Sequence, residues 1–254
     1  MNDSHGANDR VSAPGGIDIE RLLAELAKLT PDWHAHGLFS QRATSALLRH
    51  AKADVRHSLE TGTGRSTLLL SNISPQHTVF TVPDDSLTAT LSSPLLRRAS
   101  VTVVEGPTQV TLPRHKFEHE IDLALLDGPH AYPFPDLEYY YVYPHLSTGA
   151  LLVLDDIHIP TVNNLFRFVS EDSMFEPIEV VGTTAFLRRT SAPVFPADQD
   201  SWETQRYNLE RFPLSGWPSW GGPRPRMRNL VPLRVRRAVK GALPKRLRQW
   251  LISS

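Results

Sequence analysis

Cysteine is absent from this chain of 254 residues, so no disulfide framework and no thiolate metal site can form. Any metal ion would therefore have to be bound by oxygen or imidazole ligands. Such a composition suits a reducing compartment, and we expect a cytoplasmic protein. Residues 1–16 are polar and contain no apolar core segment, so we expect a disordered leader there and neither a signal peptide nor a membrane span.

Net charge is also absent, because 27 Lys and Arg residues balance 27 Asp and Glu residues. The balance hides an asymmetry, since ten of the basic residues lie between Arg224 and Arg248 and no acidic residue follows Glu210. Residues 224–254 form a basic amphipathic segment, which predicts either peripheral contact with an anionic membrane or packing on the body or on a partner subunit. The segment has few aromatic residues and no recognised binding motif, so we expect no nucleic-acid partner.

The length and the ordinary composition, with 40% hydrophobic and 21% charged residues, fit one α/β domain with a substantial core. Apolar residues at helical spacing predict two N-terminal helices within residues 17–54. Residues 55–192 then alternate strand and helix signals and form the predicted domain. A Pro/Trp-rich extension, residues 193–223, separates this domain from the basic segment.

Short apolar runs bounded by turn residues suit strands that are buried on both faces of a parallel sheet. Five such runs lie at 55–59, 78–82, 101–104, 121–126 and 150–154. Helical signals lie at 66–72, 136–146 and 160–169, and the segments 178–181 and 184–189 predict a closing antiparallel hairpin. This order predicts a doubly wound, Rossmann-like α/β sheet that is mostly parallel.

An acidic residue stands at the end of each predicted parallel strand. These residues are Glu60, Asp84 with Asp85, Glu105, Asp127, and Asp155 with Asp156. Because ligands of such sheets bind at the carboxyl ends of the strands, we expect the side chains to converge. Asp is also favoured in turns and at helix N-caps, so a purely structural role for each aspartate is the alternative interpretation.

A glycine-rich turn, ETGTGRST at residues 60–67, follows the first predicted strand. It has no lysine at its end, which excludes a phosphate-binding loop of the G-x-x-x-x-G-K-[ST] type. A dinucleotide fingerprint needs a third glycine, and Glu60 would repel a pyrophosphate. A ligand that carries a sulfonium and an ammonium group is favoured by the neighbouring carboxylates, and a turn without any ligand is the alternative.

The E-x-G-x-G pattern resembles the first motif of class I S-adenosylmethionine-dependent methyltransferases. The segments IDLALLDGPHAY, residues 121–132, and LSTGALLVLDDIH, residues 146–158, resemble later strands of this superfamily. The likeness is greatest to its macrocin-type and cephalosporin-hydroxylase-like O-methyltransferase group, and it covers residues 55–189. Two features depart from the pattern: Arg65 and Ser66 replace the third glycine, and the acid after the second strand is displaced behind Pro83.

The resemblance implies S-adenosylmethionine as the methyl donor and a divalent cation, Mg²⁺, as a second cofactor. The implied cation ligands are Asp127, Asp155 and Asp156. The residues implied for donor binding are Glu60, Gly62, Gly64, Ser66, Asp84, Glu105 and Asp127, with Asp85 as the alternative to Asp84. His130 is the predicted catalytic base, because its ordinary pKa fits proton abstraction near neutral pH, and His158 is the second candidate.

The predicted function is therefore the transfer of a methyl group to a hydroxyl oxygen of a sugar, a glycolipid or a related small molecule. A vicinal diol is the favoured acceptor, since two adjacent oxygens can bind one cation. A homo-oligomer is compatible with this prediction. Two alternatives stay open, a non-catalytic binding module that acts through the basic segment and a hydroxylase-type metalloenzyme. The hydroxylase would need iron, and no 2-His-1-carboxylate triad is evident in the sequence.

Overall fold

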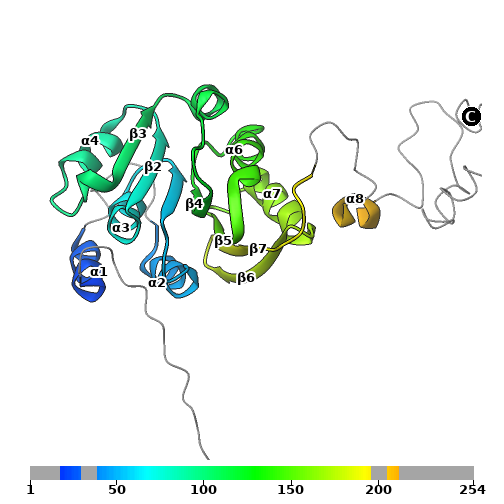
Figure 1. Ribbon diagram of the computed structural model, residues 1–254, viewed down its shortest axis with the longest axis horizontal. Helices are drawn as coiled ribbons and strands as arrows, with labels where there is room; N and C mark the ends of the chain where they lie inside the picture. The colour runs from blue at the N-terminus through cyan, green and yellow to red at the C-terminus, as the bar shows by residue number, and fades with distance from the viewer. Residues whose placement is uncertain (1–17, 30–38, 196–204, 212–254) are drawn as a thin grey trace, which may run out of the picture. The chain divides into compact units, whose positions relative to one another are not determined.

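A seven-stranded sheet with the strand order β3-β2-β1-β4-β5-β7-β6 organises the protein (Figure 1). The structure is a computed structural model, and it describes residues 18–29, 39–195 and 205–211. The strands are β1 (His57–Thr61), β2 (Gln76–Thr81), β3 (Val101–Glu105), β4 (Ile121–Leu126), β5 (Leu146–Leu154), β6 (Phe175–Val181) and β7 (Thr184–Arg189). Strands β1 to β5 are parallel, and β7 pairs antiparallel with β5 and β6. The predicted doubly wound sheet with a closing hairpin is confirmed.

Helices cover both faces of the sheet (Figure 1). They are α1 (Ile19–Lys28), α2 (Gln41–His50), α3 (Arg65–Ile73), α4 (Asp85–Ser92), α5 (Thr108–Thr111), α6 (Phe134–Val142) and α7 (Pro160–Glu171), with short 3-10 turns at Arg98–Ser100, Leu112–Arg114 and Tyr143–His145. A further helix, α8 (Arg206–Arg211), follows the sheet in the chain.

Strand β4 shows why the apolar runs of this chain are continuous. Ala124 and Leu126 belong to the apolar cluster that includes residues of α6 and α7, whereas Leu123 and Leu125 belong to the cluster that includes residues of α1, α2 and α3. Successive side chains of a strand point to opposite faces, and here both faces are buried. A strand buried in this way needs apolar residues at successive positions, which is the pattern of Leu123 to Leu126.

Most element boundaries differ from the predicted ones by a few residues, and those of β5 and α6 differ most. Strand β5 begins at Leu146 instead of residue 150, because Leu146 already pairs with Ile121 before a shift in register. Gly149 lies in this irregular stretch with φ +78°, a conformation that suits a bulge. Helix α6 begins at Phe134 and ends at Val142, where a separate 3-10 turn continues the chain.

The N-terminal helices predicted within residues 17–54 are present as α1 and α2. The predicted leader, residues 1–16, and the basic segment, residues 224–254, lie outside the described residues. The extension, residues 193–223, is described only at 193–195 and 205–211. None of the described helices combines the length and the apolar character that crossing a bilayer requires.

The position of β4 in the middle of the core leads to a stability prediction. Leu125 is fully buried, so Leu125→Ala should lower the free energy of unfolding by about 2 to 5 kcal/mol, which urea denaturation measures. Val180 lies on the edge strand β6 and is 50% exposed, and Val180→Ala is the matched control with an expected loss below about 1 kcal/mol. Equal losses in the two variants would contradict the central position of β4.

Candidate active site

The turn after β1 lies directly against the turn after β4. Gly62 has φ +91°, and its N–H donates to the Phe80 carbonyl at the end of β2 (2.8 Å). A Cβ at Gly62 would lie 2.5 Å from the Asp127 carbonyl oxygen, closer than real side chains allow. Both the backbone conformation and the close approach therefore require glycine at this position. This contact brings residues 62–66, the glycine loop, next to the candidate catalytic residues.

Glu60 is fixed by a buried chain of hydrogen bonds. The Ser66 hydroxyl donates to Glu60 Oε2 (2.7 Å), and His77 Nε2 lies 3.1 Å from Glu60 Oε1. The other ring nitrogen of His77 lies 2.8 Å from the Ser58 hydroxyl. All four residues are buried, so this chain ties the first turn of α3 to β1 and β2. A direct contact of Glu60 or Ser66 with a donor stays a prediction.

Helix α3 begins at the glycine loop and is also linked to α1. The Gly64 N–H donates to the Thr67 hydroxyl (3.0 Å), which satisfies one of the free donors at the helix start. Arg65 is buried, and its Nη2 donates to the carbonyl of Leu29 at the end of α1 (2.8 Å). Its Nε has no hydrogen-bond partner among the described residues. The α3 N-terminus thus combines backbone donors with a buried guanidinium.

The acids after β2 and β3 lie at adjacent strand ends. Thr81 of β2 pairs with Glu105 of β3, and Glu105 is exposed. Asp84 caps α4, since its carboxylate accepts from the Leu87 N–H (2.9 Å). Asp85 follows as the first residue of that helix. The capping contact is the structural role that Asp favours at a helix start, and the donor-binding roles of Asp84 and Glu105 stay predictions.

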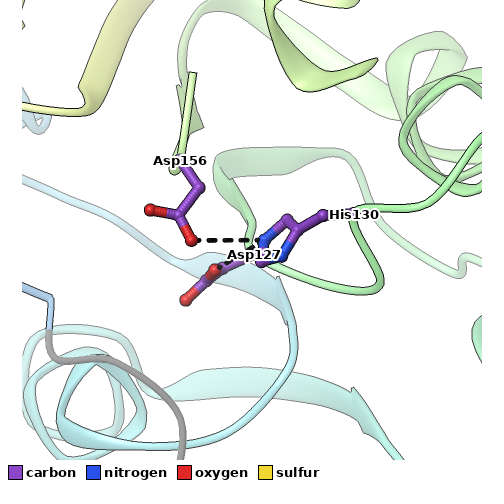
Figure 2. Close-up of side chains that lie close together, drawn as sticks. All are labelled: Asp127, His130 and Asp156. Carbon is purple, nitrogen blue, oxygen red and sulfur yellow. Dashed lines mark ion pairs between the residues drawn. The ribbon is translucent and has the colours of Figure 1, made fainter. Parts of the chain in front are cut away.

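Asp127, His130 and Asp156 form one acid–histidine cluster (Figure 2). His130 Nε2 lies 3.5 Å from Asp127 Oδ1 and 3.5 Å from Asp156 Oδ2. One ligand atom from each of the three residues lies within 4.8 Å of the others. The carboxyl ends of β4 and β5 are neighbours in the sheet, which is why residues 26 positions or more apart in the chain meet here.

Asp155 takes a different orientation from its neighbour. It is buried, and its Oδ1 accepts from the Thr184 hydroxyl (2.6 Å) and from the Asp156 N–H (2.9 Å). Asp156 adopts φ +54°, a left-handed conformation that aspartate tolerates better than most residues. The geometry therefore brings His130, not Asp155, into the group with Asp127 and Asp156, and the role of Asp155 as a cation ligand stays a prediction.

His158, the second candidate for the base, lies on the outer side of the cluster. Its Nδ1 is 3.6 Å from Asp156 Oδ1, and its side chain is 60% exposed. The side chain of His130 is only 34% exposed, and its Nε2 atom is buried without a hydrogen-bond partner among the described residues. An unpartnered nitrogen that faces two carboxylates can accept a proton or bind a cation, so His130 fits the chemistry better than His158.

Charge crowding and burial shift the titration of the cluster. Burial raises the pKa of Asp127 to about 7, and the nearby Asp155 and Asp156 carboxylates add to this shift. The Asp127 carboxylate, which faces the His130 ring at 3.5 Å, raises the pKa of His130. Burial also raises the pKa of Asp155. Carboxylates held together in this way favour bound protons or a bound cation, which is the condition for a cation site made of oxygen and imidazole ligands.

Comparison with known proteins agrees with the fold. Residues 59–157 match the model of a family described as a methyltransferase domain. A candidate O-methyltransferase from Klebsiella pneumoniae has a similar structure, with 16% identity, coverage of 70% of this chain and 92% of that chain, and a TM-score of 0.53. An O-methyltransferase from Bacillus cereus in complex with SAH is 14% identical, with coverage of 68% and 90% and a TM-score of 0.50. No curated protein sequence matches the chain.

The sheet order, the glycine loop and the family match identify residues 59–157 as a methyltransferase domain with a Rossmann-like fold. The E-x-G-x-G motif, whose resemblance to class I S-adenosylmethionine-dependent methyltransferases is described above, lies within this matched region.

The contact between the two turns can be tested with two glycine variants. Gly62→Ala should lower the free energy of unfolding by more than Gly182→Ala, as measured by urea denaturation. Both glycines have positive φ, which costs an alanine about 1 kcal/mol, but a Cβ at Gly182 meets nothing within 4 Å. The additional loss of unfolding free energy in Gly62→Ala, relative to Gly182→Ala, measures the cost of the overlap between the new Cβ and the Asp127 carbonyl. If the two variants lost the same stability, the turns would not be in close contact.

The pKa shifts lead to a prediction for the dependence of stability on pH in cation-free buffer. The raised pKa of Asp127, about 7 against an ordinary 3.8, favours the folded state at low pH, and this contribution is lost as pH rises towards 7. The raised pKa of His130 acts in the same direction, because its contribution is lost as pH rises through the raised value. The two residues should therefore make the protein less stable at pH 8 than at pH 5.

Asp127→Asn should reduce this difference in unfolding free energy between pH 5 and pH 8, as measured by urea denaturation at both values. Asp84→Asn is the control for losing one carboxylate, since Asp84 is exposed and asparagine also caps helices. An unchanged difference in the Asp127 variant would show that Asp127 does not titrate in the way described.

Proposed function

We propose that the protein transfers a methyl group from S-adenosylmethionine to a hydroxyl oxygen of a small molecule. The observation that carries this proposal is the contact between the glycine loop and the turn that begins the acid–histidine cluster, since Gly62 packs on the Asp127 carbonyl. A donor held by the loop and a proton acceptor on the neighbouring turn meet the requirement of proximity for an in-line transfer.

The donor would lie at the carboxyl ends of β1 to β4. Gly62 and Gly64 allow the ligand to approach the backbone, and the start of α3 offers N–H groups, with Ser66 and Arg65, to its carboxylate. Four acidic residues would contact other parts of the donor. Glu60 and Asp127 would lie near its ammonium group, Asp84 at its ribose hydroxyls, and Glu105 at its adenine end. The Bacillus cereus relative, which is in complex with SAH, supports a donor of this class.

His130 is the proposed proton acceptor. Its Nε2 would take the proton of the acceptor hydroxyl while the oxygen forms a bond to the methyl carbon and the bond from that carbon to the donor sulfur breaks. The Asp127 carboxylate, 3.5 Å away, stabilises the protonated imidazole, in agreement with the raised pKa of His130. S-adenosylhomocysteine and the methyl ether are the products.

Asp127 and Asp156 would hold a divalent cation, proposed to be Mg²⁺. Magnesium is often bound by one or two carboxylates together with water and substrate oxygens. The space between Asp127 and Asp156 also faces the buried Nε2 of His130, which has no hydrogen-bond partner among the described residues. The cation would supply positive charge that stabilises the developing alkoxide. We propose Asp155 as the residue that supports Asp156 from the Thr184 side.

The acceptor is proposed to be a vicinal diol of a sugar, a glycolipid or a related small molecule, since two neighbouring oxygens suit a cation held by only two carboxylates. The proposed contacts of the basic segment with a membrane or a partner subunit concern residues outside the described part of the chain. A binding module without catalysis and a metal-dependent hydroxylase are not favoured by the matched domain.

Calorimetric titration of the full chain tests this proposal. S-adenosylmethionine should bind with a micromolar dissociation constant, and Mg²⁺ should bind in a separate titration. Asp156→Asn should remove cation binding and leave donor binding intact, because Asp156 is a proposed cation ligand and is not among the residues proposed to hold the donor. His130→Gln should keep both ligands and lose methyl transfer to a diol acceptor by about a hundredfold or more.

The outcomes separate the parts of the proposal. A parent protein that binds no S-adenosylmethionine would contradict the transferase function. Loss of Mg²⁺ binding in the His130→Gln variant would show that His130 is a cation ligand and not the base. Cation binding that survives in the Asp156→Asn variant would contradict the proposed site.

A further inference from the structure

A buried carboxyl group outside the proposed machinery lies beneath the acid–histidine cluster. Glu138 of α6 is only 1% exposed, and its Oε2 accepts from the Thr61 hydroxyl at the end of β1 (2.8 Å). The same Thr61 oxygen accepts from the Asp127 N–H (3.1 Å). Glu138 is therefore connected through one side chain to the backbone of a proposed cation ligand.

The Glu138 carboxyl group also packs on the turn that joins Asp127 to His130. A Cβ at Gly128 would overlap both Glu138 oxygens and the carbon between them. A side chain at position 128 would therefore displace the Glu138 carboxyl group from its present position. Thr61 and Glu138 thus contact this turn at two points. Thr61 accepts from the Asp127 N–H, and the Glu138 carboxyl group packs against the Cα of Gly128.

A merely space-filling role does not account for a carboxyl group at this position. Glu138 Oε1 is buried and forms no well-aligned hydrogen bond among the described residues, which costs free energy, and the nearby Thr108 hydroxyl offsets only part of this cost. Burial accordingly raises the pKa of Glu138 to about 7. An apolar side chain would fill the same volume without this cost, but it could not accept the Thr61 hydrogen bond. Polar residues behind metal ligands commonly serve to orient them.

We propose that Glu138 and Thr61 are positioning residues that set the places of Asp127 and His130 for cation binding and proton transfer. This inference rests on the proposed function, and it predicts a larger effect on the cation than on the donor. The glycine loop is held mainly by the hydrogen bonds of Ser58, His77, Glu60 and Ser66, so the donor should depend less on Glu138 than the cation does.

The test is a calorimetric titration of the full chain with Mn²⁺, as an oxygen-seeking probe ion, and in parallel with S-adenosylhomocysteine. Glu138→Ala should weaken Mn²⁺ binding by about 10- to 100-fold, whereas Glu138→Gln should stay within about threefold of the parent because its carbonyl can accept from Thr61. Thr61→Val should behave like the alanine variant, and Thr61→Ser like the parent. Affinity for S-adenosylhomocysteine should stay within about threefold in both Glu138 variants.

Asp136→Ala is the matched control, since Asp136 is an exposed acid on the same helix. Should Glu138→Ala fail to fold, the comparison of Thr61→Val with Thr61→Ser decides the question. Mn²⁺ affinity equal to that of the parent in folded Glu138→Ala or Thr61→Val would overturn the inference. A parent that binds S-adenosylhomocysteine but no Mn²⁺ would overturn it together with the proposed cation site, whereas a parent that binds no S-adenosylhomocysteine would contradict the transferase function itself.

Discussion

The close packing of Gly62 on the Asp127 carbonyl is the contact on which the arrangement of the site depends. Strands β1 and β4 are neighbours, so their two turns meet at one edge of the sheet. Because no side chain separates these turns at Gly62, the glycine loop and the acid–histidine cluster share a common boundary. The Thr61 hydroxyl, which accepts from the Asp127 N–H, fixes the same two turns one residue earlier. The proposed sites of donor binding and of proton transfer therefore lie side by side.

The free-energy cost of burying several carboxyl groups is the second feature that defines the site. Asp127, Asp155 and Glu138 all have raised pKa values because burial disfavours their charged forms. The protein offsets part of this cost with neutral donors, such as the Thr184 hydroxyl for Asp155 and the Thr61 hydroxyl for Glu138. In the described part of the chain, the Asp127 and Asp156 carboxylates face the imidazoles of His130 and His158 and accept from no hydroxyl group, so a cation or a proton would stabilise them. A site that is unfavourable when empty of positive charge is well suited to attract it.

The fold could be predicted from the sequence because its strands are buried on both faces. Leu123, Ala124, Leu125 and Leu126 make an unbroken apolar run, and such a run can be recognised without knowledge of its neighbours. The start of β5 could not be predicted from the sequence. Leu146 pairs with β4 across a shift in register, and this pairing depends on β4 and not on local residue preferences. Helix α4 was missed for a similar reason, because the capping role of Asp84 becomes visible only with its Leu87 contact.

The candidate site was predicted in its residue types and only partly in its geometry. Asp127, His130 and Asp156 were recognised from strand ends, and the structure brings them together. Nothing in the sequence distinguishes Asp155 from Asp156, since the difference arises from Thr184 on a hairpin that folds back later in the chain.

His77 and Glu138 escaped the sequence analysis for another reason. Their local sequence does not mark them, because the partner of His77 lies 17 positions away and the partner of Glu138 lies 77 positions away. A single polar residue of this kind signals a buried network only when the fold has placed a partner beside it.

A crystal structure of the protein grown with S-adenosylhomocysteine and Mn²⁺ would test the central claim most directly. The account predicts ligand density along residues 62–66 and an anomalous manganese peak between the carboxylates of Asp127 and Asp156, with His130 facing the space between the two. Ligand density away from the glycine loop, or a manganese peak elsewhere on the protein, would contradict the shared donor and cation site.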